Sequence, residues 1–591
     1  MKATAVWASS HRFRARGALL AVLAMGTFAL PAPAAADDAR VLRWGDDRVV
    51  AGEEAFILAG REAPLLERPV LEGRLRSALL ELETADAELI AAQLKPATSA
   101  VQGFASTTLA ASYTGSPYSN SSKTPTAFDG TATFGPGSRP FYSTETMNAV
   151  LAQPGILDLR LSLVTGPLAL DVDTELRPAS NWYRLGAPLN WNAGIVADTN
   201  RIDINFPYRG IATFLQGPFE IRVGRDKLQL GPGRESGLSF NAGMPWADFA
   251  SARVDTGPVS FSWYLVRLNP YLTDDERRWM DAIYAGTATN PDPAVYELLH
   301  TEAEKNVAVC RLTWRIFPWA TMALTQHDLV GGRSMQLSDL NPLIIWHNLF
   351  QEGVYGVPVM AELSLTPLPG LRVYGQYLLY DATVGDEVGT NTDNAGASAY
   401  LAGLTAVLRP FGEGFLSDSR LRIDGEFTLT DPWVYGKAYS YRQFTSRYVF
   451  VEPYSGRFWV DYPIGPSFGP DAWKADLRIG LGRANGTEIA LHPSYFERGS
   501  ITLIGYGDGS DYSHQSTFHR VGMVFVKSGE TPERRLTMGL EAKSSLGAMG
   551  PVRFAVKGSF DAVWDWNYGF TAGQDRFWMD ATLAVSAAIG N

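Results

Sequence analysis

The chain has 591 residues, a formal net charge of −11 and a single cysteine. One cysteine excludes an internal disulfide and a thiolate metal cluster. The acidic balance argues against nucleic acid as a partner, because nucleic-acid binding needs a basic face. The length would suit several domains, but the sequence has no Pro/Ser-rich linker and no apolar run long enough for a transmembrane helix. One large β-architecture therefore fits better.

Residues 1–36 have the pattern of a secretory signal peptide, with an apolar stretch over 17–30 and small residues before Asp37. The stretch begins after four basic residues, Lys2, Arg12, Arg14 and Arg16. Cleavage before Asp37 would leave 555 residues and would take the formal charge from −11 to −15. A membrane anchor is the alternative, but the apolar stretch is shorter than the roughly 20 residues that a spanning helix needs.

Residues 37–100 are predicted to form a periplasmic N-terminal segment with an amphipathic helix over 70–94. Apolar residues recur there at helical spacing: Leu71, Leu75, Ala78, Leu82, Ala85, Leu89 and Ala92. Two roles remain open for this helix. It either plugs or braces the mouth of the structure that follows, or it packs as a surface helix on its own segment.

From residue 101 onward, apolar and polar residues alternate with the period of two that is typical of β-strands. In 157–177, two such runs of leucines flank the turn Thr165-Gly166-Pro167. Further runs occupy 219–224, 258–267, 371–379, 420–429, 475–481, 536–543, 552–564 and 577–589. Turns rich in Gly and Pro recur at 216–218, 256–258, 367–370 and 549–551. Long excursions separate the other runs, near 114–154, 178–209, 228–248, 268–306, 327–356, 381–397, 430–472 and 506–518.

The apolar face of these runs could meet either protein or lipid. A soluble sandwich would bury it in a core, whereas an outer-membrane barrel would turn it to lipid and the charged face to a wet lumen. Short turns at one end and long loops at the other favour the barrel, and backbone in hydrocarbon requires a closed sheet. At about 10 residues per strand the chain holds roughly 16 to 18 strands, and we favour 18.

The predicted fold is therefore all-β. It is a transmembrane antiparallel up-and-down β-barrel over 101–591, in the bacterial outer membrane, with a short N-terminal periplasmic helix. Outer-membrane lipid and the barrel-assembly machinery are the expected partners of such a chain. The final residue, Asn591, departs from the terminal aromatic residue typical of outer-membrane proteins.

Charged residues on the polar faces of these strands are predicted to line the lumen. They are Asp171, Asp173, Glu175, Arg222, Arg225, Arg372, Arg422, Asp424 and Glu426. Opposed charges of this kind could select a solute. The alternative is that they hydrate the wall and pair across strands.

Aromatic and basic residues gather in 431–473. The candidate ligand-binding residues there are Trp433, Tyr435, Tyr439, Tyr441, Arg442, Arg447, Tyr454 and Trp459. Aromatic faces beside positive charges could bind acidic sugars. An interfacial girdle or the folded core of a long loop would use the same residues.

Chemistry of another kind finds little support. Residues 508–519 combine Asp508, Asp511, His514, Ser516 and His519, but without a nucleophile elbow, zinc-ligand spacing or a full calcium-loop pattern. We therefore predict no catalytic residue, no metal site and no cofactor. On this reading the protein is not an enzyme.

Residues 221–255 resemble the capsule-assembly Wzi family. The resemblance lies in Gly231-Pro232-Gly233, a following Ser-Gly-Leu step, an Asn-Ala-x-x-Pro step at 241–245 and Ala252-Arg253-Val254-Asp255, with a second similar segment at 337–350. It implies an outer-membrane barrel of about 18 strands with periplasmic helices, which acts as a surface lectin for capsular or other surface polysaccharide. A porin-like diffusion channel for small charged or sugar solutes is the alternative function.

Overall fold

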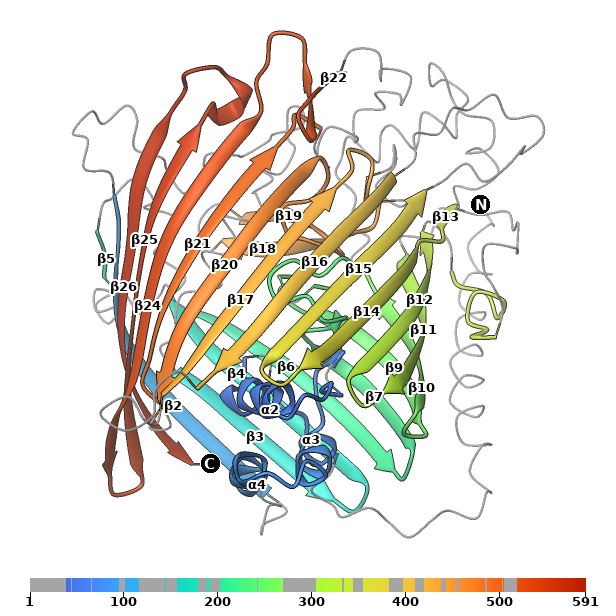
Figure 1. The fold of residues 1–591 in the computed structure, drawn as a ribbon, viewed down its shortest axis with the longest axis vertical. Helices are drawn as coiled ribbons and strands as arrows, with labels where there is room; N and C mark the ends of the chain where they lie inside the picture. Colours follow the sequence, from blue (N-terminus) through green and yellow to red (C-terminus); the bar gives the residue numbers. More distant parts are fainter. Residues whose placement is uncertain are drawn as a thin grey trace, which may run out of the picture.

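The chain forms a closed antiparallel β-barrel of 18 strands, as predicted (Figure 1). The computed structural model describes residues 39–43, 45–64, 66–94, 101–115, 144, 157–178, 189–191, 202–241, 243–268, 304–331, 334–343, 354–381, 397–409, 419–436, 443–452, 456–483, 486–501, 503 and 518–590. The predicted signal peptide lies outside these ranges.

Each barrel strand pairs with the next one along the chain, and β2 pairs with β26 to close the sheet. In chain order the strands are β2 (Val101–Gly115), β3 (Leu157–Thr165), β4 (Leu168–Pro178), β6 (Ile202–Gln216), β7 (Phe219–Asp226), β9 (Ala247–Asp255), β10 (Val259–Arg267), β11 (Lys305–Phe317), β12 (Ala320–Gly331), β14 (Val359–Leu368), β15 (Leu371–Asp381), β16 (Ala397–Leu408), β17 (Ser419–Thr430), β20 (Ala472–Arg483), β21 (Glu488–Arg498), β24 (Glu533–Met549), β25 (Val552–Trp566) and β26 (Arg576–Gly590).

Other short strands lie beside or between these. Two extend the sheet locally, β5 (Leu189–Trp191) and β13 (Val354–Gly356). Two hairpins belong to long connections, β18 (Thr445–Glu452) with β19 (Gly456–Pro463), and β22 (Phe518–Val521) with β23 (Val524–Lys527). A two-residue pair, β1 (Glu67–Arg68) with β8 (Gln229–Leu230), lies apart from the barrel sheet.

The short connections lie at one end of the barrel, and several of them contain glycine in left-handed backbone. Gly166 between β3 and β4 has φ 54°, and Gly217 between β6 and β7 has φ 56°. Residues with a Cβ rarely adopt this conformation, which explains why glycine recurs at these turns. In outer-membrane barrels the end with short turns is the periplasmic one, so the long connections lie at the outer end.

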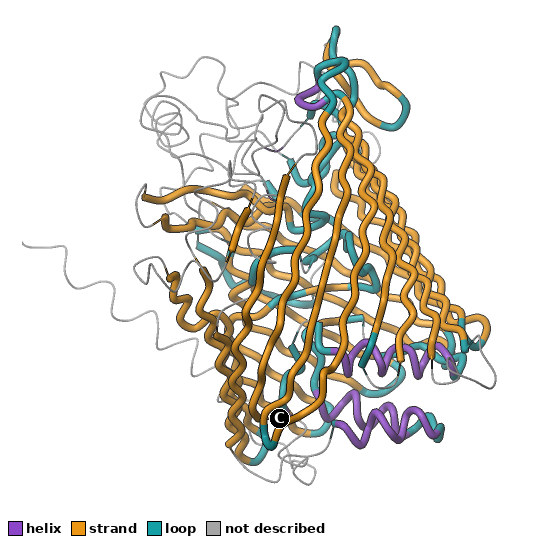
Figure 2. The backbone as a smooth tube through the Cα atoms, turned by 90° about the vertical axis from the view of Figure 1, so that its left-hand side faces the viewer, coloured by secondary structure: helices purple, strands orange, loops and turns teal. Residues whose placement is uncertain are grey.

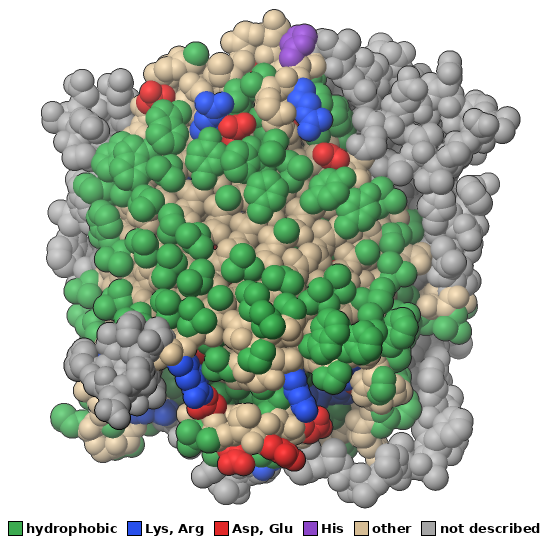
Figure 3. Space-filling model, in the orientation of Figure 1, with side chains coloured by type: hydrophobic (Ala, Val, Ile, Leu, Met, Phe, Trp, Pro, Cys, Tyr) green, Lys and Arg blue, Asp and Glu red, His purple; other side chains and the backbone are tan. Residues whose placement is uncertain are grey.

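The two faces of the wall have opposite character. On β3 the side chains of Leu159 and Leu161 are 42% and 43% exposed, whereas on β4 Asp171 and Asp173 are 6% and 3% exposed. Side chains alternate across a strand, so the leucines point out and the carboxylates point in. Figure 3 shows the result on one side of the barrel, where a broad apolar belt lies between charged groups at both ends. This is the face that an outer-membrane barrel presents to lipid.

The predicted helix over 70–94 is in fact two helices, α3 (Glu72–Leu80) and α4 (Ala85–Gln93). Glu83 has φ 52°, which breaks the helical backbone, and the Thr84 side chain accepts a hydrogen bond from Ala87 N at the start of α4. Because of this break, the residues of α4 that are buried differ from those of the predicted apolar stripe. Leu89, expected on the apolar stripe, is 65% exposed, while Ile90 is buried.

A further helix, α2 (Asp47–Leu58), was not predicted. Buried residues of the N-terminal segment pack together around it: Leu42, Val49, Phe56, Leu75, Leu79 and Ile90 are among them. The three helices lie at the end of the barrel with the short turns (Figure 2). Among the described residues, no helix is long and apolar enough to cross a membrane.

Candidate functional site: the filled lumen and the outer loops

Buried ion pairs hold the N-terminal segment, residues 39–94, against the inner wall of the barrel. Glu53 on α2 pairs with Arg372 and Arg422, each at 2.7 Å, and no side chain of these three is more than 6% exposed. Glu62 pairs with Arg372 at 3.4 Å. A buried charge is costly unless it is paired, so each group depends on its partner. These contacts fix the segment to β15 and β17.

The same segment also reaches strands on the opposite side of the barrel. Arg43 pairs with Asp158 on β3 at 3.0 Å and with Asp173 on β4 at 2.6 Å. In the strand order, β3 and β4 lie about half a turn from β15 and β17. The N-terminal segment therefore spans the lumen.

Glu67 is the centre of a third buried network. Its carboxylate accepts hydrogen bonds from Ser262 Oγ at 2.7 Å and from Tyr264 Oη at 2.6 Å, and Arg311 and Arg253 lie at 3.4 and 3.7 Å. Burial alone would raise the pKa of Glu67, but the two guanidinium groups and the hydroxyl donors outweigh it and lower the pKa to about 2. Glu67 is thus charged at neutral pH.

The connection between β7 and β9 folds into the lumen and meets the N-terminal segment there. Its residues 229–230 form β8, which pairs with β1. The carboxylate of Glu426 on β17 accepts three consecutive backbone N–H groups of this connection, at 2.8, 3.2 and 2.7 Å, from Arg234, Glu235 and Ser236. The segment that resembles the Wzi family therefore includes an internal filling of the barrel.

Gly231 in this connection shows why the Gly-Pro-Gly sequence begins with glycine. Its φ is 99°, and a Cβ there would collide with the side chains of Gln376 and Glu362 on the wall. Gln376 also accepts a hydrogen bond from Leu238 N at 3.0 Å. The close approach of backbone to wall leaves room for glycine alone.

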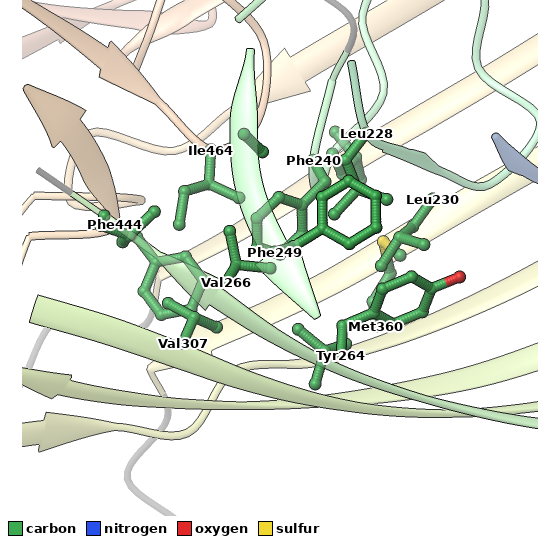
Figure 4. Close-up of a cluster of buried hydrophobic side chains, with 14 of the residues drawn as sticks. Leu228, Leu230, Phe240, Phe249, Tyr264, Val266, Val307, Met360, Phe444 and Ile464 are labelled. Carbon is green, nitrogen blue, oxygen red and sulfur yellow. The ribbon is translucent and has the colours of Figure 1, made fainter. Parts of the chain in front are cut away.

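The connection between β17 and β20 enters the lumen from the outer end. Tyr435 is fully buried, and its hydroxyl donates to Leu238 O at 2.8 Å. Phe444 lies with its ring edge toward His327 at 5.6 Å between ring centroids. Figure 4 shows Phe444 and Ile464 of this connection beside Phe240 of the β7–β9 connection and Val266 and Val307 of the wall. These inward loops and the wall share one apolar core.

The predicted lumen residues lie mostly on the inner face. The buried ones are Asp171, Asp173, Arg222, Arg372, Arg422, Asp424 and Glu426. The side chain of Glu175 lies outside the described residues. Arg225 is a correction to the prediction. It lies three positions from Arg222, so strand alternation turns it to the other face. There it pairs with Asp248 at 2.7 Å and is 37% exposed.

The predicted ligand-binding residues of 431–473 do not form one exposed cluster in the part of the chain that the structure describes. Trp433 is half-buried with its edge toward Phe525, whereas Tyr435 and Arg447 are buried, and Arg447 pairs with Asp461 at 2.7 Å. Tyr435 and Arg447 are therefore corrections, because the loop folds inward and buries them. Outside the described residues lie Tyr439, Tyr441, Arg442, Tyr454 and the side chain of Trp459.

Sequence reasoning missed the charged partners in the N-terminal segment. They are Arg43, Glu53, Glu62, Glu67 and Arg74, and Arg74 pairs with Glu220 and Asp255 on the wall. One signal was present: Glu53 and Glu54 interrupt the apolar sequence of α2. Two neighbouring carboxylates on an otherwise apolar helix indicate buried cations as their partners, because acidic side chains are rarely buried unless they are paired.

The closed sheet, the outward apolar belt and the charged inner wall define a β-barrel of the outer-membrane type. Among solved structures, Wzi of Escherichia coli is similar, with a TM-score of 0.51 and 12% identity over 92% of this chain and 99% of that chain. Its description is an outer-membrane protein involved in group 1 capsule assembly and a carbohydrate-binding β-barrel.

OprD of Pseudomonas aeruginosa is a weaker match, with a TM-score of 0.36 and 8% identity over 83% of this chain and 95% of that chain. OpdQ of the same organism has a TM-score of 0.38 and 7% identity, over 83% and 98%. No known protein-family profile matches the sequence, and no curated protein matches it. The likeness to Wzi, at 12% identity, shows the fold alone.

Proposed function

We propose that this chain is a non-enzymatic outer-membrane barrel that binds surface polysaccharide through its outer loops. The observation that carries the proposal is the filled lumen, in which buried polar contacts bind the N-terminal segment and two inward connections to the wall and to each other. Because the lumen is filled, the outer end of the barrel is the surface at which it can contact a polysaccharide. The likeness to Wzi, described as carbohydrate-binding, supports the same function.

A diffusion channel is the second candidate, and one part of the wall favours it. On β24 and β25, Glu541 is 34% exposed and Asp561 is 31% exposed. Both alternate with outward apolar residues such as Leu540 and Phe560, which places the two carboxylates on the inner face. Solvent therefore reaches some of the inner wall beside the filling.

Conductance in a planar bilayer separates the two functions. We expect the full-length protein to show no large steady open current, and the double variant Glu53→Gln/Glu62→Gln to show more frequent openings. The reason is that the variant removes both carboxylates that pair with Arg372 and one of those that pair with Arg422, which keeps Asp424. Asp47→Asn is the control, since that carboxylate is 82% exposed. Large steady currents from the unmodified protein would contradict the proposal and support the channel.

A further inference from the structure

We propose that the β22–β23 hairpin, residues 518–527, is a polysaccharide-contacting surface and that it selects anionic chains, namely those that carry sugar carboxylates. The inference rests on the proposed function and names both a site and a ligand class for it. The hairpin is separate in sequence from the candidate ligand-binding residues predicted in 431–473. The hairpin lies at the outer end of the barrel (Figure 1).

Two exposed cations of the hairpin are held over aromatic rings. The guanidinium carbon of Arg520 lies 5.7 Å from the ring centroid of Phe525, and Lys527 Nζ lies 5.6 Å from that of Phe518. Both cations are exposed, while both rings are half-buried. A ring face attracts a cation without neutralising it, so each side chain is oriented and keeps its charge for a ligand.

The arrangement differs from that of the buried arginines. Those are matched to carboxylates, as Arg372 is to Glu53. Within the described ranges, neither Arg520 nor Lys527 has a carboxylate oxygen within 4.0 Å of its charged nitrogens. The chain as a whole is acidic, with a net charge of −11. Unmatched surface cations on such a protein indicate an anionic ligand.

The carboxylates near the hairpin already have partners. Glu497, beside Gly522, pairs with Arg534 at 2.8 Å, and three others accept backbone N–H groups. Asp471 accepts from Phe525 N at 2.9 Å and Ile501 N at 3.3 Å. Asp431 accepts from Ser398 N at 2.9 Å, and Glu530 accepts from Lys527 N at 3.2 Å. These bonds turn the acids toward the main chain. The two cationic groups are left as the charges that the hairpin presents to solvent.

The hairpin is also fixed in place. Asp471 is fully buried and anchors β23 through Phe525 N, while Ser500 N donates to Phe525 O at 2.9 Å. The edge of Trp433 meets the Phe525 ring at 5.9 Å between centroids. A rigid surface loses little entropy when it binds. A polymer with a carboxylate in each repeat can rebind at successive units, which raises its avidity.

The test uses the full-length protein in detergent and three polyuronates, alginate, pectate and hyaluronan, each beside its own carboxyl-reduced form. We expect binding to at least one polyuronate and at least about tenfold weaker binding to its reduced form, because charge-assisted hydrogen bonds are lost. Arg520→Gln/Lys527→Gln should weaken binding of the polyuronate by a similar factor. Raising the salt concentration should weaken it as well.

Arg553→Gln/Lys557→Gln is the matched control, because both cations are exposed on β25 toward the opposite end of the barrel. Its binding should equal that of the unmodified protein, and unchanged heat-modifiability on gels checks the folding of each variant. Equal binding of native and reduced polymers, or no effect of Arg520→Gln/Lys527→Gln, would overturn the inference and leave the proposed function standing. Failure to bind any polymer, including reduced forms and neutral dextran, would overturn the proposed function itself.

Discussion

Asp471 illustrates how one buried carboxylate controls an outer loop. Its carboxyl group is fully buried and accepts the N–H groups of Phe525 and Ile501. Burial raises the pKa of Asp471 to about 7, although these two hydrogen bonds and Arg520 act in the opposite direction. The folded pKa thus lies above the ordinary value of 3.8. The stability that this group contributes is complete below pH about 4 and is lost as the pH rises through about 7.

We therefore expect the Phe525 amide to be better protected from hydrogen exchange at pH 5 than at pH 8, after correction for the intrinsic exchange rate. Asp471→Asn should remove this pH dependence because an amide does not titrate, although its one oxygen can replace only one of the two carboxylate oxygens that accept Phe525 N and Ile501 N. Asp431→Asn serves as a comparison, since the Asp431 carboxylate interacts with the charge of Arg520 but accepts its hydrogen bond from Ser398 N and none from Phe525 N. A variant at Asp471 that keeps the full pH dependence would show that another group is responsible.

At the scale of elements, the break between α3 and α4 depends on Thr84. Its hydroxyl caps α4 by accepting from Ala87 N at 3.3 Å. We expect Thr84→Ala to destabilise α4 by about 1 kcal/mol, the usual loss for an N-cap. Faster hydrogen exchange of the α4 amides would measure it. Thr84→Ser keeps the hydroxyl and should leave the exchange of those amides close to that of the original protein.

The strands were predictable because a period of two is a local pattern. The runs at 371–379 and 552–564 correspond to β15 and β25 with errors of a few residues. The prediction of one helix over 70–94 was only partly right. It assumed continuous helical spacing from Leu82 to Leu89, whereas the left-handed backbone at Glu83 interrupts the helix between them. Propensity does not reveal such a reset, because almost every residue type in the segment is a good helix former.

Of the candidate site, only the residues on the barrel strands could be predicted from the sequence. Strand alternation placed Arg372 and Arg422 on a charged face, but it could not name Glu53 as their partner, 319 and 369 residues away in sequence. For the same reason, the sequence could not separate the two alternatives for 431–473, an exposed ligand-binding loop and the folded core of a long loop. Tyr435 is buried by Leu238 and other distant residues, and an aromatic residue in a loop has the same local pattern whether that loop folds in or out.

For the whole molecule, stability depends on the outward apolar belt. Leu161 lies in the middle of β3 with 43% exposure. We expect Leu161→Arg to lower the free energy of unfolding in lipid vesicles by about 2 to 4 kcal/mol, the cost of a cation near the bilayer midplane. Leu161→Ile keeps the apolar surface and should change that energy by less than about 1.5 kcal/mol. An equally small loss with arginine would mean that this face does not meet lipid.

The seam between β2 and β26 has a consequence for biogenesis. The last strand, 15 residues long, supplies the hydrogen-bonding partner for one edge of the first. Synthesis that stops before residue 576 therefore yields a sheet with two open borders, and such borders recruit further chains. The cylinder is therefore incomplete until residues 576–590 are present.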